Sequence, residues 1–484
     1  MQLRDKKKEE TIMAKPVQLD ANGYRKFGTI DKLAYAAGDF GCNMSFALKS
    51  YLTIFWTQYM GIDSILMASL LLLVQVWDAI NDPLIGGLID ADKRQYKRNK
   101  FLTYIWLGSL GLMLGGAFCF LPFRGAPAMV KNILFVAGYI IWDAFYTIAN
   151  VPYGSMLSLI TTDAGERAQL STFRSAGAMV GGMACGVVIP MLIYDADSNL
   201  KGDTLFLIAL FMGFLGFIAF QFMIRKTVVR VDTTVTLNEE GPKFNPVKAT
   251  INFCKNRAAI GVTLMALAQI ICMYGVTTAS QVMFQAYFKN AQISGLLGML
   301  SYFGLFLFMP FIGKMVAKFG KKECVTAGML VTVVAYGLML ILPITPDGKG
   351  LAMYAACQAL AALGNGPGTC VGWSLVADFI DYGEWKTGNR DEGTNYALYS
   401  FFRKLAQGIG PSMGLVLATL LGYNAALGAN QPAEVALTMR YMVAWGYLAG
   451  QALQLISIGL IYNLDKKTLA KIHADLAERK AAAK

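Results

Sequence analysis

Two carboxylates, Asp78 and Asp82, occur four residues apart in the sequence WDAINDP at positions 77–83. The flanking sequences, LLLVQV and LIGGLI, are almost entirely apolar. Residues four apart share one face of a helix, and Asn81, three residues after Asp78, shares that face. Two acids this close in a low dielectric favour a bound proton, whereas a bound cation keeps both ionised. The heptapeptide therefore predicts a proton or Na⁺ site, or a purely structural ion pair with Lys49 or Arg174.

The rest of the chain is typical of a membrane protein. Its 484 residues are 55% hydrophobic and 15% charged, whereas a soluble domain is about 25% charged, and the mean hydropathy is +0.46. Continuous apolar runs, long enough to cross a bilayer as helices, recur throughout. They predict an all-α polytopic fold with twelve spans, at 30–60, 64–90, 101–122, 129–160, 171–195, 204–224, 258–288, 293–317, 323–344, 349–382, 394–422 and 435–463.

The spans fall into two sets of six. The predicted division is a tail at 1–28, a bundle at 29–224, a central loop at 225–257, a second bundle at 258–463 and a tail at 464–484. PLIG at 83 returns as PFIG at 310, an offset of 227, and FRSAG at 173 resembles FRKLA at 402, an offset of 229. These matches predict a duplicated six-helix unit with a ligand site between the halves. Chance similarity between apolar segments is the alternative.

Lys and Arg are concentrated in both tails, the 90–100 loop, the central loop and the 318–322 turn. By the positive-inside rule these segments face the cytoplasm, which accounts for the net charge of +12 without a nucleic-acid partner. The single histidine, His473, lies in the C-terminal tail. Without an intramembrane imidazole we expect no enzyme, no metal beyond a possible Na⁺ and no cofactor, and we expect a functional monomer.

Further polar side chains interrupt the predicted spans. Ionisable groups inside a membrane are functional candidates by default, which draws attention to Lys49, Asp143 and Arg174. Asp143 is either a site residue or a partner for a buried cation. Tyr146 and Asn150 offer uncharged hydrogen bonds that suit sugar hydroxyls or helix packing equally.

Three motifs together resemble the glycoside–pentoside–hexuronide:cation symporters, which belong to the major facilitator superfamily. They are WDAINDP, DFIDYGEWKTGNRDEG at 378–393 and YSFFRK at 399–404. The resemblance implies two six-helix bundles and sugar uptake by alternating access, coupled to Na⁺, H⁺ or Li⁺, in a bacterial inner membrane. It assigns cation binding to Asp78, Asn81, Asp82 and Thr147, and sugar contacts to Tyr146, Arg174 and Lys404.

The chain departs from that family where the cargo binds. Cys42–Asn43 stands where melibiose permease-like members carry a Lys–Asp pair, and Asn150 stands where they carry an Asp. The cavity is therefore expected to be more positive, and a guanidinium group suits a carboxylate or sulfonate. We hypothesise an anionic sugar such as a glucuronide; a neutral glycoside or pentoside, or a non-transporting sugar sensor, are the alternatives. The predicted substrate site comprises Asn43, Lys49, Tyr146, Asn150, Arg174 and Lys404.

A last set of charges lies near the predicted cytoplasmic ends of the spans. We interpret them as candidates for salt bridges between the bundles that hold the outward-open state, with solvated loop charges as the alternative. They are Asp90, Arg167, Asp378, Asp381, Glu384 and Arg390.

Overall fold

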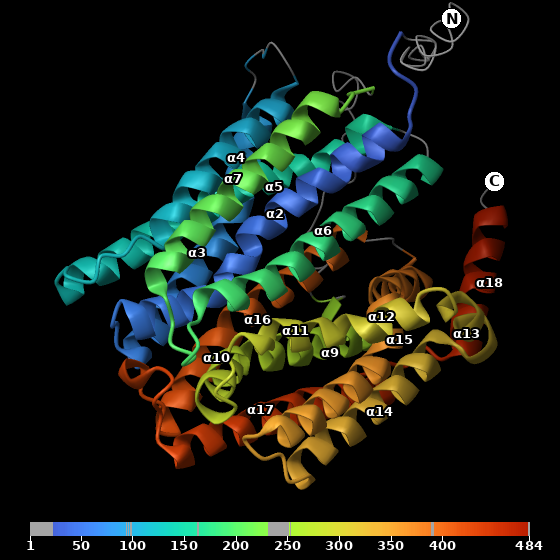
Figure 1. Cartoon of the computed structure of the whole chain (residues 1–484). Coiled ribbons are helices and arrows are strands. Elements are labelled where there is room, and N and C mark those ends of the chain that lie inside the picture. The colour runs from blue at the N-terminus through green and yellow to red at the C-terminus, as the bar shows by residue number, and fades with distance from the viewer. Residues whose placement is uncertain are drawn as a thin grey trace, which may run out of the picture.

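The computed structural model describes residues 23–92, 94, 96, 99–161, 164–230, 251, 253–388 and 392–482. Long helices form two bundles that lie side by side (Figure 1). The N-terminal half consists of α2 (Thr29–Ile54, continued by a π-helix at Phe55–Tyr59), α3 (Ser64–Ala91), α4 (Lys100–Cys119), α5 (Ala128–Ile160), α6 (Ala164–Ile193) and α7 (Gly202–Lys226).

The C-terminal half has more interruptions. It consists of α9 (Arg257–Gly275), α10 (Thr277–Val282) with a π-helix at Met283–Tyr287, α11 (Ile293–Gly298), a 3-10 helix at Met299–Tyr302, α12 (Phe303–Phe308), α13 (Ile312–Phe319), α14 (Lys321–Ile341), α15 (Gly348–Thr387), α16 (Glu392–Leu420), a 3-10 helix at Ala425–Leu427, and α17 (Ala433–Ile456) with a π-helix at Ser457–Ile461. A final helix, α18 (Lys466–Ala482), follows.

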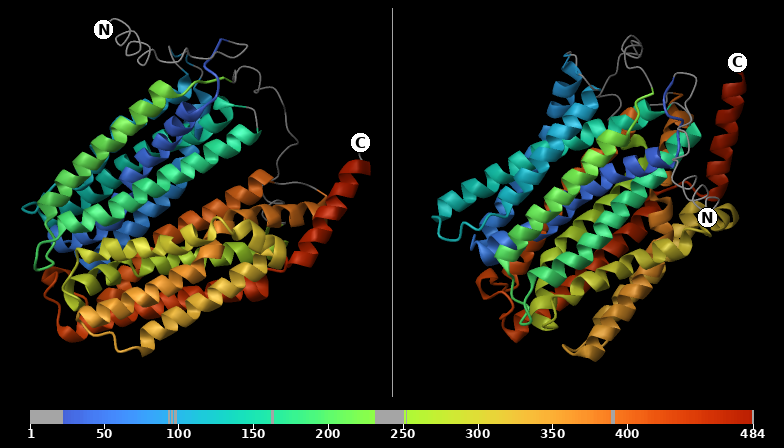
Figure 2. Two further views of the ribbon diagram at one scale, coloured as in Figure 1. Left: turned by 45° about the vertical axis from the view of Figure 1, so that its right-hand side comes forward. Right: turned by 45° about the horizontal axis from the view of Figure 1, so that its top comes forward.

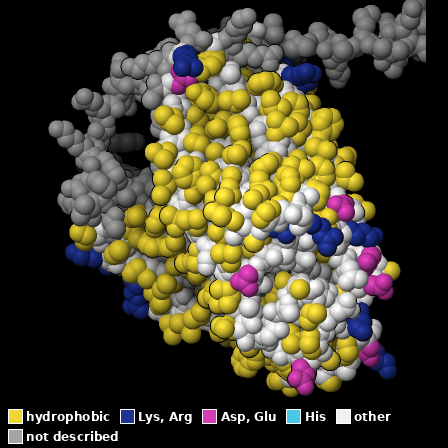
Figure 3. Space-filling model, turned by 90° about the vertical axis from the view of Figure 1, so that its left-hand side faces the viewer, with side chains coloured by type: hydrophobic (Ala, Val, Ile, Leu, Met, Phe, Trp, Pro, Cys, Tyr) yellow, Lys and Arg dark blue, Asp and Glu magenta, His cyan; other side chains and the backbone are white. Residues whose placement is uncertain are grey.

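The outer surface is apolar, as a lipid-facing surface must be. On α7, Leu207, Phe211, Phe214 and Ile218 form an exposed stripe at helical spacing, and hydrophobic side chains cover much of the face in Figure 3. Within the part of the chain that the structure describes, eight helices are long and apolar enough to cross a membrane, or nine if α11–α12 and α13 form one bent span. The protein is therefore a multi-pass membrane protein.

One feature differs from the sequence-based expectation, and a second one adds to it. The span predicted at 293–317 is not one straight helix: it bends by 65° between Phe308 and Ile312. Pro310 lies at the bend and supplies no backbone N–H. The C-terminal tail is helical and packs on α15: the Trp385 indole Nε1 donates to Asp475 at 2.8 Å, and Arg479 donates to the Trp385 carbonyl at 2.9 Å.

The two halves contact each other through α3 against α16 and α6 against α11 (Figure 2). At one end, which we call the closed end, hydrogen bonds join the halves directly. The Gln58 amide donates to Gln285 Oε1 and to the Tyr423 hydroxyl, each at 3.0 Å. Gly295 of α11 sits so close to the Gly186 carbonyl of α6 that a Cβ at this position has no room.

Candidate functional site

Three of the four residues predicted to bind the cation form one hydrogen-bonded cluster. The Thr147 hydroxyl of α5 donates to Asp82 Oδ1 of α3 at 2.7 Å, and the Asn81 amide donates to Thr147 Oγ1 at 2.9 Å. Asn81 and Thr147 are each only 1% exposed. The i,i+3 and i,i+4 spacing on α3 puts Asp78 beside the same cluster. The structure therefore brings together on α3 and α5 the oxygen atoms that the sequence singled out.

The opposite half contributes a cation to this cluster. Lys404 of α16 extends its ammonium group to α3, where Nζ lies 3.7 Å from Asp78 Oδ1 and also contacts Asp82 Oδ2. An ion pair between the halves thus stands at the predicted coupling site. Since the two carboxylates already hold a positive charge, any Na⁺ or proton that binds them must compete with Lys404.

Lys49 and Asp143 form a second buried pair, entirely inside the N-terminal half. Lys49 Nζ of α2 donates to Asp143 Oδ1 of α5 at 3.2 Å, and it lies 5.2 Å and 5.5 Å from the ring centroids of Tyr139 and Tyr146. Asp143 Oδ2 also accepts from Asn81 at 3.3 Å. Of the two roles left open for Asp143, the geometry supports that of a partner for a buried cation, and it links this pair to the Asp82 cluster.

Arg174 does not present an unpaired guanidinium to the cavity. Its Nε lies 3.4 Å from Asp39 Oδ1 on α2, and its guanidinium carbon is 4.9 Å from the Tyr153 ring centroid. Either charge would be costly to bury in the membrane without a partner. The pair neutralises both charges where α2 packs on α6. A role for Arg174 in binding an anion would have to compete with Asp39.

Asn43 and Asn150, where the chain departs from melibiose permease-like members, each contact a neighbouring group. The Asn43 amide donates to the Asp39 carbonyl one turn back on α2 at 2.9 Å, and Asn150 Oδ1 is 3.7 Å from Cys42 Sγ. Close by, a cavity lies between the halves. It is lined by Lys49, Gln75, Asp78 and Tyr139 from one half and by Tyr274, Thr277 and Gln407 from the other.

Sequence reasoning missed Gln75, Tyr139 and Asp39. The Gln75 amide donates to the Tyr139 hydroxyl at 2.7 Å in the wall of this cavity. Its position three residues before Asp78 on α3 was a usable signal, because i,i+3 residues share a helix face. Asp39 had no such signal, since only the packing of α6 on α2 reveals its partner.

Two of the acids predicted to form salt bridges between the bundles have basic neighbours in their own half. Asp378 pairs with Lys321 at 2.7 Å and Asp381 lies 3.4 Å from His473 Nε2, both within the C-terminal half or its tail. Glu384 lies on α15 in the last turn before Gly388. The side chains of Asp90, Arg167 and Arg390 lie outside the described residues. Since the bridges were hypothesised for the outward-open state, they stay a prediction.

No group of three or more His, Cys, Asp and Glu side chains that could hold a metal ion occurs in the described ranges. The cluster at Asp78 and Asp82 has two carboxylates, supplemented by the oxygen atoms of Asn81 and Thr147. Such hard oxygen ligands suit Na⁺ or a proton rather than a transition metal.

Two helical bundles with charged side chains buried between them define a class of protein, the membrane transporters. Residues 34–460 match the family model described as MFS/sugar transport protein. The chain therefore belongs to this family of the major facilitator superfamily. It is a transporter and not an enzyme.

Full-length relatives support this assignment. The chain is 29% identical over 453 residues to the uncharacterized symporter YjmB of Bacillus subtilis (93% of this chain, 95% of that protein). It is 26% identical over 455 residues to the glucuronide carrier protein homolog of Escherichia coli (93% and 95%). It is also 26% identical over 462 residues to the isoprimeverose transporter of Lactiplantibacillus pentosus (93% and 92%).

Among solved structures, the fold is similar to that of a bacterial homologue of the human lysosomal transporter Spinster in an inward-facing, unoccupied conformation. The TM-score is 0.60 at 15% identity, covering 92% of this chain and 99% of the other. At that identity the likeness concerns the fold alone.

Proposed function

We propose that the protein is a secondary active symporter that carries a glycoside, pentoside or hexuronide across the membrane together with Na⁺ or H⁺. The observation that carries the proposal is the cluster of Asp78, Asp82, Asn81 and Thr147, which is met by Lys404 from the opposite half. A cation that displaces the Lys404 ammonium breaks an ion pair between the halves. Ion binding is thereby tied to the relative position of the two bundles, as symport requires.

The closed end gives the direction of access. The helix ends that adjoin the basic segments of the sequence, namely the start of α2 and the ends of α3 and α7, lie away from the closed end, so the positive-inside rule makes the closed end extracellular. The hydrogen bonds of Gln58 with Gln285 and Tyr423 then form an outer gate, and the structure is an inward-facing state. The loaded carrier rocks between this state and an outward-open one in a bacterial inner membrane, and it works as a monomer with both termini in the cytoplasm.

The charge balance favours an anionic cargo. Four basic side chains of the helices, Lys49, Arg174, Arg403 and Lys404, are matched in number by four acids, Asp39, Asp78, Asp82 and Asp143. With one bound cation this region gains a positive charge, which a monoanionic sugar neutralises at low cost in a low dielectric. The names of the relatives include both a glucuronide carrier and an isoprimeverose transporter, so a neutral glycoside is the second candidate.

Uptake into proteoliposomes tests the coupling. We expect Asp82→Cys to abolish uptake stimulated by a Na⁺ or H⁺ gradient while counterflow of substrate persists. Asp63→Asn is the matched control, because Asp63 caps the same helix through the Ile65 and Leu66 amides and Asn is an equally good cap. Gradient-driven uptake that survives in Asp82→Cys would refute the proposed cation site.

The cargo is tested on the wild-type protein by comparing uptake of 4-nitrophenyl β-D-glucuronide with that of the corresponding glucoside. Preferential uptake of the glucuronide supports the anionic cargo, and preferential uptake of the glucoside supports the alternative. Binding without counterflow of either compound would identify a sensor instead of a transporter.

A further inference from the structure

Arg403, a half-buried cation of α16, has neither a carboxylate nor a carbonyl partner among the described residues. Five basic side chains lie deep within helices: Lys49, Arg174 and Lys404 pair with acids, and Arg440 donates to the carbonyls of Met339 and Leu342 at 2.7 and 3.1 Å. The fifth, Arg403 of α16, forms no hydrogen bond or ion pair within the described part of the chain and lies against two aromatic rings. Its guanidinium carbon is 5.0 Å from the Trp373 ring centroid and 5.6 Å from that of Tyr399. Cation–π contacts attract a guanidinium group without cancelling its charge.

The internal repeat explains why Arg403 is unpaired. Arg174 and Arg403 occupy the same position in FRSAG and FRKLA. The partner of Arg174 is Asp39 on α2, and α9 begins 228 residues after α2, so the equivalent position on α9 is Leu267. The sequence of α9, RAAIGVTLMALAQIICMYG, contains no acid at all. The C-terminal half thus keeps the arginine of the repeat and lacks its counterion.

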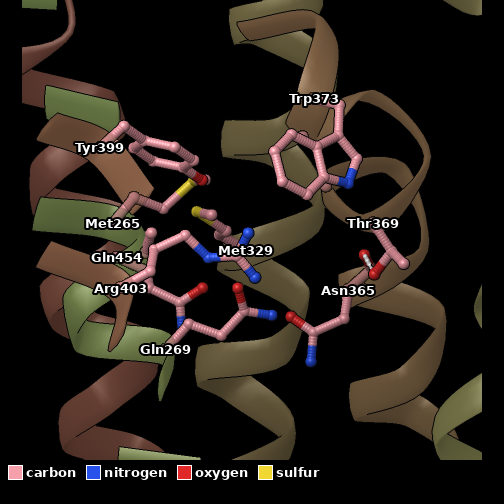
Figure 4. Close-up of a pocket in the computed structure, with 13 residues that line it drawn as sticks. Met265, Gln269, Met329, Asn365, Thr369, Trp373, Tyr399, Arg403 and Gln454 are labelled. Atoms are coloured by element: carbon pink, nitrogen blue, oxygen red, sulfur yellow. Dashed lines mark hydrogen bonds between the residues drawn. The ribbon is translucent and has the colours of Figure 1, made fainter. Parts of the chain in front are cut away.

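Arg403 points into a pocket inside the C-terminal half. We call it the C-half pocket and define it by Gln269, Asn365, Trp373, Tyr399, Arg403 and Gln454. Figure 4 shows the guanidinium group and the amide ends of Gln269 and Asn365 directed toward the same space. Gln269 and Trp373 are exposed, so the pocket is open on one side. A cation, three amides and an aromatic ring are the groups that bind the carboxylate and ring of an acidic sugar.

We propose that the C-half pocket binds the carboxylate group of the anionic sugar, with Arg403 as its counterion. This inference rests on the proposed transport of an anionic sugar and assigns to the C-terminal half the recognition that the sequence motifs attributed to Arg174. The pocket volume of about 240 Å³ is below the ~300–1,000 Å³ typical of whole-ligand sites. It therefore holds the acidic ring of a larger glycoside rather than the entire molecule.

The C-half pocket adjoins the coupling site through the chain itself. Arg403 and Lys404 are consecutive on α16, so their side chains diverge by about 100° around the helix: one lies in the pocket and the other reaches Asp78 and Asp82. A cation that binds the two acids adds positive charge within a few residues of Arg403, which strengthens the attraction for an anion. By reciprocity the bound anion strengthens cation binding by the same factor.

Titration calorimetry on the purified full chain tests the inference, with 4-nitrophenyl β-D-glucuronide and 4-nitrophenyl β-D-glucoside as probes. We expect Arg403→Gln to weaken glucuronide binding at least about tenfold, as loss of a charge-assisted hydrogen bond does, and to change glucoside binding less than about twofold. Gln269→Glu, at an exposed position and nearly isosteric, should act in the same direction because it supplies the missing internal carboxylate. Arg403→Lys should retain part of the preference.

The outcomes separate this inference from the proposed function. If wild-type protein prefers the glucuronide and both Arg403→Gln and Gln269→Glu keep that preference, the pocket assignment is wrong and anionic transport stands. A selective loss in Arg174→Gln alone would also overturn it. Wild-type protein that binds the glucoside and not the glucuronide would overturn the anionic cargo together with the pocket assignment.

Discussion

The N-terminal half pairs its deeply buried cations with acids of its own, as Lys49 with Asp143 and Arg174 with Asp39 show. The C-terminal half contributes Lys404 to the acids of the other half, and it leaves Arg403 against aromatic rings. The acids proposed to bind the coupling cation therefore lie in one half, while the basic side chain without an acidic partner lies in the other. In the proposed symporter, the cation and the anionic sugar bind in opposite halves.

The two halves also differ in whether the helix at this position of the repeat is straight or bent. In the N-terminal half, α3 runs unbroken from Ser64 to Ala91 through Pro83 and carries Asp78 and Asp82. Its repeat equivalent bends by 65° at Pro310, and the positions that correspond to the two acids, at the offset of 227, are Leu305 and Met309. The unbroken helix carries the proposed ion ligands, whereas the bent one packs against α6 and α15.

The largest effect is expected from breaking the buried pair of the N-terminal half. Lys49→Met leaves Asp143 charged without its counterion, which costs about 3–5 kcal/mol in buried pairs. Arg403→Met should cost much less, because no acid is left unpaired. Thermal unfolding in detergent measures both, and Lys49→Met/Asp143→Leu should recover most of the loss. Equal destabilisation by the two single substitutions would contradict the contrast between the halves.

The contact between the halves is tested at Gly295. Gly295→Leu has no room beside the Gly186 carbonyl, so the closed end cannot form and uptake should fall at least about tenfold, equivalent to ~1.4 kcal/mol. Gly298→Leu on the same short helix is the control, because a Cβ there meets nothing within 4 Å. Similar uptake rates for the two variants would show that α6 and α11 need not approach closely.

The hydrogen bonds of the cation cluster predict a smaller effect. Thr147→Val removes the donor to Asp82 and the acceptor for Asn81, at about 1 kcal/mol per bond. The apparent cation affinity should fall about fivefold or more, while Thr147→Ser retains it. Cation dependence of uptake provides the measurement. An unchanged cation affinity in Thr147→Val would remove α5 from the coupling site.

The smallest effect is expected at the outer gate. Gln58→Ala removes its hydrogen bonds to Gln285 and Tyr423, which are only partly buried, so a shift of about 0.5–1 kcal/mol toward the outward-open state is expected. Since Gln58→Ala already removes both reciprocal hydrogen bonds between Gln58 and Gln285, adding Gln285→Ala should change little further. Counterflow rates two- to fivefold above or below wild type would fit, and strictly additive effects would contradict a shared contact.

Much of the fold could be predicted because membrane helices leave a strong trace in the sequence. The predicted span at 64–90 and the observed α3 at Ser64–Ala91 differ by one residue, since apolar runs have to match the bilayer. The bend at Pro310 was not predicted, because Pro83 and Pro190 occur within unbroken helices. Whether a proline bends its helix depends on how neighbouring helices satisfy the freed backbone groups.

Arg403 illustrates the limit for the site. It is part of YSFFRK and lies eleven residues after the start of α16. The alignment of FRSAG with FRKLA already paired it with Arg174 and was the one available signal. That signal gave no indication that Arg174 had a carboxylate beside it and Arg403 did not, because the partners are on helices more than a hundred residues away.

The amino-acid sequence by itself determined the class of the protein, the two-bundle plan and the shared face of Asp78, Asn81 and Asp82. These follow from local rules: the length of apolar runs, the helical repeat and the cost of charge in lipid. The tertiary structure decided which charges are cancelled. Pairing of Lys49, Arg174 and Lys404 depends on contacts between distant helices, and electrostatic energy in a low dielectric is set by those few ångströms rather than by residue type.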